Sequence, residues 1–276
     1  MEDKLIQNNL KLEILISTMH KESFTFVEKM FPFQEFENLN ILIINQTEIG
    51  KELHSTFPNI RVVNSYEKGL SKSRNLAIQN AVGDTCLIAD DDVEYLPNFE
   101  ETVKNAFIKF SGAAIIRFKI NTFSGEDYKH YPIVSKRLYR KKDIENTSSI
   151  EIAFKREVIS NKIYFNTQFG LGSYFTCGEE YLFLKETLKQ KKEVYFENTA
   201  IVKHSVESST SNMASDQFVK AQAALYYHDY KVLSYLYLFK FVIFLLRKKN
   251  ILLKSFKSKY MTGLAAIKFY KELDNE

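Results

Sequence analysis

The first part of the chain contains four short apolar runs, and a segment with the apolar spacing of a helix lies between the third run and the fourth. The runs at residues 12–17, 41–44, 60–63 and 85–89 contain β-branched residues and are largely apolar on both faces. Strands of this kind lie inside a parallel sheet that helices cover on both sides. Residues 70–81 have the apolar spacing of such a helix. The pattern therefore predicts an α/β fold with a mostly parallel sheet.

Size and composition are sufficient for a substantial core. The chain has 276 residues, of which 45% are hydrophobic and 14% aromatic, and this suits one large domain with or without an appendage. Its two cysteines, Cys86 and Cys177, lie far apart and predict neither a disulfide scaffold nor a zinc site. The first residues lack the apolar segment of a secretion signal, so we expect a cytoplasmic protein.

The pattern changes after residue 112. Pro97 suits the first turn of a helix that runs to about residue 110, and a later helix at 179–190 opens with two glutamates. Everything after residue 215 has helical character. We therefore expect a catalytic body over residues 1–210 and a helical tail over residues 211–276. Further strands are predicted at 113–120, 149–154, 194–196 and 200–202.

Three consecutive carboxylates, Asp90, Asp91 and Asp92, follow the fourth apolar run. Folding alone does not offset their mutual repulsion, whereas a hard cation binds carboxylate oxygens and takes up their charge. Ligands of open α/β sheets bind at the carboxyl ends of the strands. The triplet therefore predicts a metal-assisted site for a phosphate-bearing substrate. The alternative is an acidic loop that caps the next helix.

Three further clusters carry groups suited to catalysis: SKSRN at residues 71–75, the pair Glu179 and Glu180, and His204. Each has a structural interpretation when taken alone. Ser71 or Ser73 would be a helix N-cap, and Arg74 would be a surface ion-pair partner. The two glutamates would complement a helix dipole, and the histidine would be a polar surface residue.

The order of these clusters resembles the family 2 glycosyltransferases, an inverting group with a GT-A fold. The resemblance covers about residues 12–205, and its matching text is GLSKSRNLA at 69–77, DDDV at 90–93, GEE at 178–180 and His204. It implies a GT-A, Rossmann-like central sheet, mixed and mostly parallel, flanked by helices and followed by a C-terminal helical appendage. It also implies a nucleotide-binding half over residues 1–95 and an acceptor half over 96–210.

The resemblance implies a donor-binding role for six positions. Ser17 and Thr18 would line the nucleotide base pocket. Asn45 would lie beside them, where the family often has an acidic residue that contacts the base. The remaining donor contacts would come from Arg74, to the diphosphate or the base, and from Asp90 and Asp91, to the ribose and the base.

The resemblance also implies a metal site and a catalytic base. Asp92 and His204 would bind Mn²⁺ or Mg²⁺, and an imidazole ligand favours Mn²⁺. A divalent ion on the phosphates stabilises the leaving diphosphate, and a carboxylate must accept the proton of the acceptor hydroxyl. Glu180 stands at the aspartate position of the family's usual Glu-Asp pair. Glu180 is the predicted base. Because its side chain is one methylene longer than that of aspartate, Glu179 remains the alternative base.

The predicted function is metal-dependent, inverting transfer of a hexosyl or N-acetylhexosaminyl group. The donor would be a nucleotide sugar, most simply a UDP-sugar, and the acceptor a saccharide or lipid-linked molecule in cell-surface glycan synthesis. One alternative is a catalytically inactive GT-A domain that serves as a nucleotide-binding or scaffold subunit at the membrane, although the charged clusters are intact. A nucleotidyltransferase is the other, but no glycine-rich phosphate loop follows the first strand, where TMHK stands at 18–21.

The tail differs from the body in charge. Residues 230–271 contain ten basic and no acidic residues, so residues 230–276 carry a net charge of +7 and the remainder −3. Its most apolar stretch, 232–246, would span about 22 Å as a helix, short of a hydrocarbon core of about 30 Å. Basic residues among large apolar ones favour a helix lying on the inner face of the cell membrane. Packing on the body and a homodimer interface are the alternatives, and no nucleic-acid-binding motif accompanies the charges.

Overall fold

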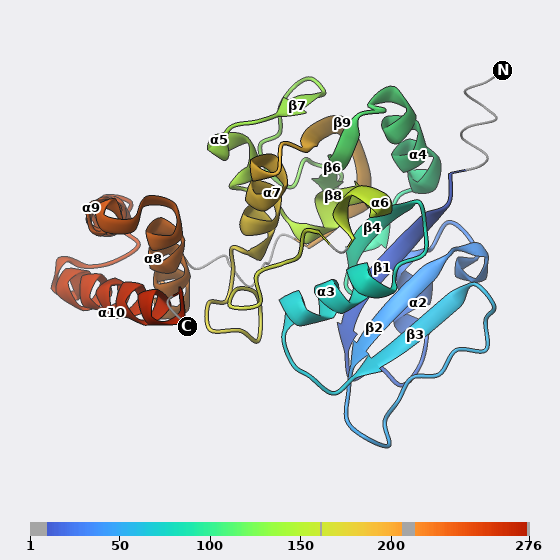
Figure 1. Cartoon of the computed structure of the whole chain (residues 1–276), viewed down its shortest axis with the longest axis horizontal. Coiled ribbons are helices and arrows are strands. Elements are labelled where there is room, and N and C mark those ends of the chain that lie inside the picture. Colours follow the sequence, from blue (N-terminus) through green and yellow to red (C-terminus); the bar gives the residue numbers. More distant parts are fainter. Residues whose placement is uncertain (1–9, 161, 206–212, 275–276) are drawn as a thin grey trace. The chain divides into compact units, whose positions relative to one another are not determined.

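The structure is a computed structural model that describes residues 10–160, 162–205 and 213–274 (Figure 1). The chain divides into two compact units, Met1–Asn166 with Glu180–Val206 and Thr167–Glu179 with Glu207–Glu276. The second division falls near residue 210, where the sequence predicts the end of the body. The loop Thr167–Glu179 belongs to the second unit, which the sequence did not indicate.

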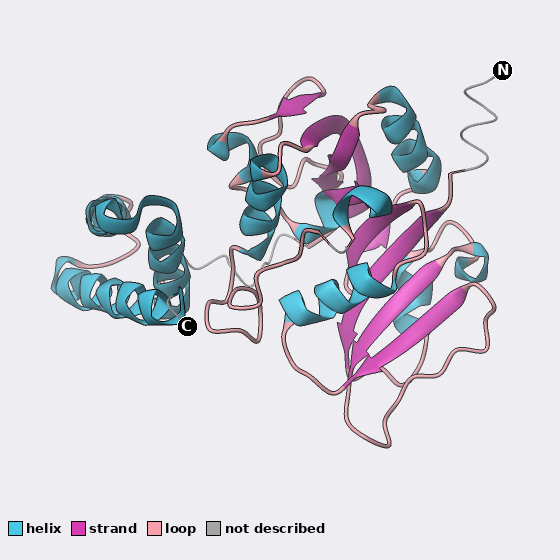
Figure 2. Cartoon of the chain, in the orientation of Figure 1, coloured by secondary structure: helices cyan, strands magenta, loops and turns pink. Residues whose placement is uncertain are grey.

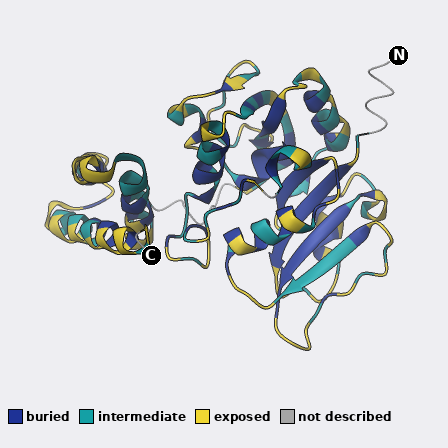
Figure 3. Ribbon diagram, viewed as in Figure 1, coloured by how far each residue is buried: buried dark blue, intermediate teal, exposed yellow. Residues whose placement is uncertain are grey.

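Four parallel strands form one half of the sheet in the first unit, in the order β3-β2-β1-β4 (Figure 2). They are β1 (Leu12–Met19), β2 (Ile41–Gln46), β3 (Ile60–Ser65) and β4 (Thr85–Asp90). Each coincides with a predicted apolar run and extends one or two residues beyond it. β2 is buried along its whole length (Figure 3), because side chains on both faces of the sheet pack under helices.

The other half of the sheet is mixed. It continues with β8 (Ile152–Lys155), β6 (Ala113–Asn121), β9 (Glu193–Lys203) and β5 (Glu94–Tyr95), while β7 (Lys136–Leu138) pairs with β9 off this path. β6 and β9 are parallel, whereas β8, β5 and β7 pair antiparallel with their neighbours. The α/β class and the mixed, mostly parallel GT-A sheet are therefore confirmed.

Two strand predictions in this half need correction. The stretches 194–196 and 200–202 form one continuous strand, β9, because its pairing with β6 absorbs irregular register shifts where the apolar pattern is interrupted. Residues 149–151, predicted as the start of a strand, form a 3₁₀ turn, η2 (Ser149–Glu151), and β8 starts only after it.

The helices of the first unit are α2 (Thr25–Met30), α3 (Leu70–Asn80), α4 (Phe99–Lys109), α5 (Lys141–Ile144), α6 (Arg156–Ile159) and α7 (Glu179–Lys189), whose first residue lies in the other unit. The predicted serine cap of α3 is wrong. Its N-cap is Gly69, at a φ of 128° that favours glycine, and the Gly69 N–H donates to Gln46 Oε1 at 2.7 Å. Pro97 precedes the N-cap Asn98 of α4, so it does not occupy the first turn.

The second unit is helical, as predicted. It contains α8 (Asp216–Tyr230), α9 (Ser234–Arg247) and α10 (Phe256–Asp274), with 3₁₀ turns η3 (Lys231–Leu233) and η4 (Leu253–Ser255) between them. A Cβ at Gly263 of α10 would lie 2.5 Å from Leu238 of α9, so glycine permits this close helix packing. Phe169 and Phe175 of the loop stack on each other and contact the Tyr270 ring. None of the described helices combines the length and apolar character that crossing a bilayer requires.

Candidate active site

The carboxyl ends of three neighbouring parallel strands bring the predicted donor-binding residues together. Ser17 of β1 lies opposite Asp90 of β4, and Thr18 lies opposite Asn45 of β2. Ser17 and Thr18 are buried, and the Ser17 hydroxyl has no hydrogen-bond partner within the described part of the chain. This edge of the sheet is the usual place for a ligand in an open α/β fold.

Asn45 holds the loop that follows β1. Its Oδ1 accepts a hydrogen bond from Lys21 N at 3.0 Å, and its Nδ2 donates to Lys21 O at 2.9 Å and to Asn64 Oδ1 at 3.1 Å. The braced loop places the Lys21 ammonium 3.0 Å from Asp91 Oδ2. Asp91 Oδ2 also accepts a hydrogen bond from Thr18 Oγ1. Sequence reasoning missed Lys21 as a site cation, because a single lysine in a loop gives no pattern.

Arg74 joins three elements at the centre of the site. Its side chain is only 3% exposed, with Nη2 3.1 Å from Asp90 Oδ1 and Nη1 3.2 Å from Glu180 Oε1. The guanidinium carbon also lies 5.6 Å from the centre of the Phe165 ring. The surface ion pair considered for Arg74 is therefore wrong, since the guanidinium is buried between two carboxylates. Removing one member of such a group leaves the others buried without compensation.

Neighbouring residues fix the Arg74 group. The Asn75 side chain donates to Phe165 O at 2.9 Å and accepts from Phe165 N at 2.7 Å, which holds the ring over the guanidinium. Ser149 Oγ donates to Asp90 Oδ2 at 2.9 Å. Neither the role of Phe165 nor that of Ser149 was recognisable in the sequence, because both act across long separations along the chain.

The two candidate bases differ in their surroundings. Glu180 is 16% exposed and faces Arg74, whereas Glu179 is buried and belongs to the second unit. Burial raises the pKa of Glu180, and the positive charge of Arg74 only partly opposes this shift. A carboxyl with a raised pKa at a ligand-facing sheet edge is suited to proton transfer.

Asp92 and His204 form a pair at the same edge. Asp92 Oδ2 lies 3.5 Å from His204 Nε2, and the hydrogen bond between them lowers the pKa of Asp92 and raises that of His204. His204 N donates to Asn121 O at 2.9 Å, which anchors the residue just past β9. Its Nδ1 lies 2.6 Å from Ser205 O. A carbonyl only accepts, so Nδ1 carries a proton, and Nε2, which faces the Asp92 carboxylate, would have to release its own proton before it binds a cation.

This pair fits a divalent ion that is shared with a substrate. Two ligand atoms bound to one ion at about 2.0–2.2 Å each are separated by about 3 Å, close to the observed distance. No cluster of three or more histidine, cysteine or acidic side chains suited to a metal occurs among the described residues. Mg²⁺ commonly takes one or two carboxylates and completes its shell with substrate phosphates and water. A divalent ion held by Asp92 and His204 would therefore take its remaining ligands from the substrate and water.

Solved structures show the same GT-A architecture as this chain. The crystal structure of S. aureus TarS 1–349 superposes with a TM-score of 0.58 at 14% identity, over 94% of this chain and 80% of that one. Its complex with UDP gives 0.55 at 15% identity, and its complex with UDP-GlcNAc gives 0.54 at 14%, each with the same coverage. At such low identity the likeness establishes the fold alone.

The family follows from the sequence. The profile of glycosyl transferase family 2 matches residues 34–174, slightly more than half of the chain. The protein therefore belongs to glycosyl transferase family 2 and is a glycosyltransferase. A comparison with curated protein sequences finds no match.

Proposed function

We propose that the protein is a metal-dependent, inverting glycosyltransferase that uses a UDP-sugar and a saccharide or lipid-linked acceptor. The observation that carries the proposal is the contact of Asp90 and Glu180 with the buried Arg74 guanidinium. These residues lie at the edge of the sheet that also holds Asp92 and His204. The neighbouring TarS structures contain UDP and UDP-GlcNAc, which supports a uridine nucleotide as the donor. A hexosyl or N-acetylhexosaminyl group is the expected cargo.

The donor would lie across the carboxyl ends of β1, β2 and β4. Ser17, Thr18 and Asn45 would surround the base, with Asp90 and Asp91 at the base and the ribose. Arg74 and Lys21 supply positive charge beside these carboxylates. Asp92 and His204 would hold Mn²⁺ or Mg²⁺, which when bound neutralises charge on the diphosphate.

The transfer itself needs one base. Glu180 accepts the proton of the acceptor hydroxyl as the hydroxyl oxygen forms the new bond to the anomeric carbon. The bond from that carbon to the diphosphate oxygen breaks, and the diphosphate leaves with the electron pair. Attack opposite the leaving group inverts the anomeric configuration, so no covalent sugar–enzyme bond is required.

Binding of the donor nucleotide provides the direct test. UDP with Mn²⁺ or Mg²⁺ is expected to raise the Tm of the protein by roughly 5 °C at a concentration about 100-fold above Kd. ADP and GDP with the same metal serve as controls and are expected to give no comparable shift. Equal stabilisation by all three nucleotides, or none by UDP, would contradict the UDP-sugar proposal. Differential scanning fluorimetry measures these shifts.

The helical unit also has a surface that suits an anionic membrane. Large apolar side chains are exposed on and beside α9, and basic residues that end α9 lie next to them in sequence. We include peripheral contact with the inner face of the cell membrane in the proposal, since lipid-linked acceptors reside there. A homodimer through the aromatic tail stays a prediction. The exposed apolar residues are Val232, Leu233, Tyr235, Leu236, Phe239, Phe244, Leu252 and Leu253.

Vesicle flotation tests this surface. The protein is expected to float with phosphatidylserine-containing vesicles at low salt and to remain in solution with neutral vesicles. Replacing Arg247, Lys248 and Lys249 together by Gln should weaken binding roughly 100-fold, since each basic residue contributes about 1 kcal/mol near such a surface. The control replaces three lysines of the body, Lys189, Lys191 and Lys192, by Gln. Equal loss in both triple variants, or no flotation of the unmodified protein, would exclude the assigned surface.

A further inference from the structure

A pocket of about 300 Å³ opens in the first unit beside β7 and α5, in the half of the body predicted to receive the acceptor. Four cationic side chains and one carboxylate line it, giving a net formal charge of +3 with His130 neutral. These are Arg117, Lys136, Arg140, Lys142 and Asp143. Such an excess of positive charge in a concave site favours an anionic ligand.

The cations of the pocket are not equally available. Asp143 lies 3.5 Å from Lys136 Nζ and 3.2 Å from Arg140 Nε, so two cations share one carboxylate. Burial opposes ionisation of Asp143, but hydrogen bonds from Arg140 and the nearby positive charges lower its pKa to about 2. Lys142 is exposed and forms no ion pair with any residue that the structure describes. Positive charge therefore remains for a ligand.

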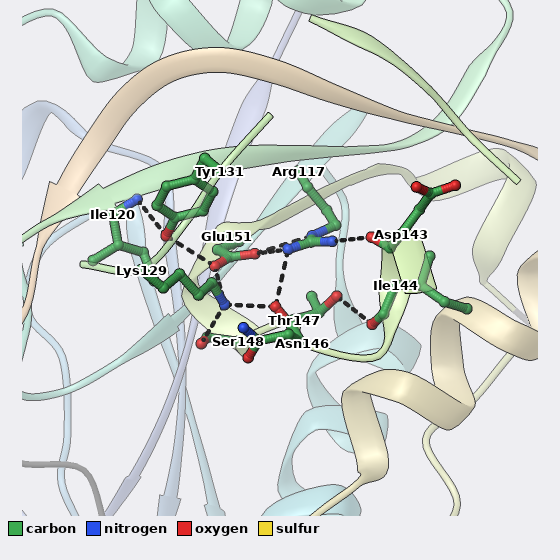
Figure 4. Close-up of polar contacts among 10 residues, drawn as sticks. All are labelled: Arg117, Ile120, Lys129, Tyr131, Asp143, Ile144, Asn146, Thr147, Ser148 and Glu151. Atoms are coloured by element: carbon green, nitrogen blue, oxygen red, sulfur yellow. Dashed lines mark hydrogen bonds and ion pairs between the residues drawn. The ribbon is translucent and has the colours of Figure 1, made fainter. Parts of the chain in front are cut away.

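The lining residues Arg117 and Tyr131 belong to a buried ionic network with Glu151 and Lys129, which we call the floor of the pocket (Figure 4). Glu151, which is fully buried, accepts hydrogen bonds from Arg117 Nε at 3.0 Å and from the Tyr131 hydroxyl at 3.1 Å, and it pairs with Lys129. Arg117 Nη1 also donates to Asp143 O at 2.7 Å. Glu151 is shared by Arg117 and Lys129, so Arg117 is held within this network, and Lys136, Arg140 and Lys142 are the other cations that line the pocket.

One wall of the pocket is apolar. The rings of Tyr131 and Phe196 stack with centroids 5.7 Å apart and planes 8° from parallel, and Pro132 and Leu138 complete this wall. A pocket lined by both apolar rings and cations fits a ligand that carries an anionic group on a ring or chain. A neutral saccharide would use the apolar rings but would add no negative charge to the one carboxylate that Lys136 and Arg140 share.

A short segment connects the pocket to the catalytic residues. Ser149 donates to Asp90 at the donor edge. Two residues further on, Glu151 holds Arg117 and Tyr131 of the pocket. Lys129 Nζ, which pairs with Glu151, also donates to Ser148 Oγ at 3.2 Å. The same turn therefore supports the donor carboxylate and the floor of the basic pocket.

We propose that this pocket binds a phosphate group of the acceptor substrate. The inference rests on the proposed glycosyltransferase function and narrows its acceptor to a phosphate-bearing class. The phosphate oxygens contact Lys136, Arg140 and Lys142, and the atoms attached to the phosphate pack on the Tyr131 wall. The phosphate belongs either to a phosphodiester-linked glycan or to a lipid diphosphate, which share this chemistry.

The test measures binding of two soluble probes by calorimetry in EDTA, so that no metal promotes phosphate binding at the donor edge. The probes are glycerophosphoglycerol, a phosphodiester, and geranyl diphosphate. Replacing Lys136 and Lys142 together by Ala is expected to raise the Kd of the probe of the correct class about tenfold. The control variant replaces Lys189 and Lys191 by Ala and should bind like the unmodified protein. The exposed Lys142→Glu variant repeats the test without touching an ion pair of the fold.

The outcomes separate this inference from the proposed function. If the Lys136 and Lys142 double variant loses tenfold in affinity for the phosphodiester probe alone, the acceptor is phosphodiester-linked. If it loses tenfold in affinity for the diphosphate probe alone, the acceptor is lipid-linked. Binding of neither probe, or equal loss in the control variant, overturns the pocket assignment. The UDP thermal shift of the unmodified protein is independent of both. A normal UDP thermal shift without binding of either probe keeps the UDP-sugar proposal and rejects the phosphate pocket. Binding of a probe without a UDP thermal shift keeps the phosphate pocket and rejects the UDP-sugar proposal.

Discussion

Replacing Glu180 by Gln is expected to lower kcat for sugar transfer by about 10²- to 10⁴-fold, the usual contribution of a positioned general base. Gln keeps the size of the side chain and can still accept the hydrogen bond from Arg74 Nη1, so the buried group around the guanidinium is preserved. The amide cannot accept the proton of the acceptor hydroxyl. We therefore expect kcat to fall with little change in the Kd of UDP, measured by single-turnover transfer and by UDP titration.

Glu179→Gln is the matched control, because it makes the same change one residue away. It should retain most of the transfer rate if Glu180 is the base. The pH dependence gives a second readout. Burial raises the pKa of Glu180. As the pH is lowered, kcat should therefore begin to fall at a higher pH than the titration of an ordinary glutamate would give. This fall should be absent from the residual rate of Glu180→Gln. A larger loss in Glu179→Gln would assign the base to Glu179.

Replacing Asp92 by Ala is expected to reduce transfer by about 10²- to 10³-fold, because stabilisation of the leaving diphosphate is worth several kcal/mol. The unmodified protein in EDTA should fall to a similar rate, and added Mn²⁺ should restore it. EDTA should have little further effect on Asp92→Ala, since both treatments remove the same contribution. Initial rates of UDP release in the presence of acceptor measure the unmodified protein and the variant under each of these conditions.

Asp127→Ala provides the control for this change, since Asp127 is an exposed carboxylate that pairs with Lys119 and not with Asp92 or His204. It should keep both its rate and its sensitivity to EDTA. His204→Ala is expected to resemble Asp92→Ala with a smaller loss, because the negatively charged ligand, Asp92, would remain to hold the cation. Metal-independent turnover, or full activity of Asp92→Ala, would rule out the proposed use of a metal.

The central strands were predictable because the apolar residues within each strand are enough to indicate that the strand is buried. β1, β2 and β4 are apolar on both faces, and that pattern needs no knowledge of distant residues. The start of α3 was not predictable in the same way. Ser71 and Ser73 are good capping residues by type, but the helix begins at Gly69, whose N–H donates to Gln46 on another strand. Contacts between distant segments thus decided what local preference left open.

The site shows the same division. The carboxylates Asp90 to Asp92 stood out because three adjacent charges at a strand end need partners from elsewhere. In the structure each of the three has a basic side chain beside it within the chain. Arg74 did not stand out, because a lone arginine is most simply a surface residue. Its burial depends on Asp90, Glu180 and Phe165 arriving from three other segments. Lys21 and Ser149 are further examples, as their partners lie 70 and 59 positions away along the chain.

The Arg74 guanidinium contacts two carboxylates, Asp90 and Glu180, and this limits which substitutions these three positions can accept during evolution. A lysine at position 74 offers a single ammonium and cannot reproduce the forked contact with Asp90 and Glu180. Each of the three positions is therefore selected in the context of the other two. In descendants of this chain we expect the trio to be inherited as a block, with compensated double or triple exchanges outnumbering single ones.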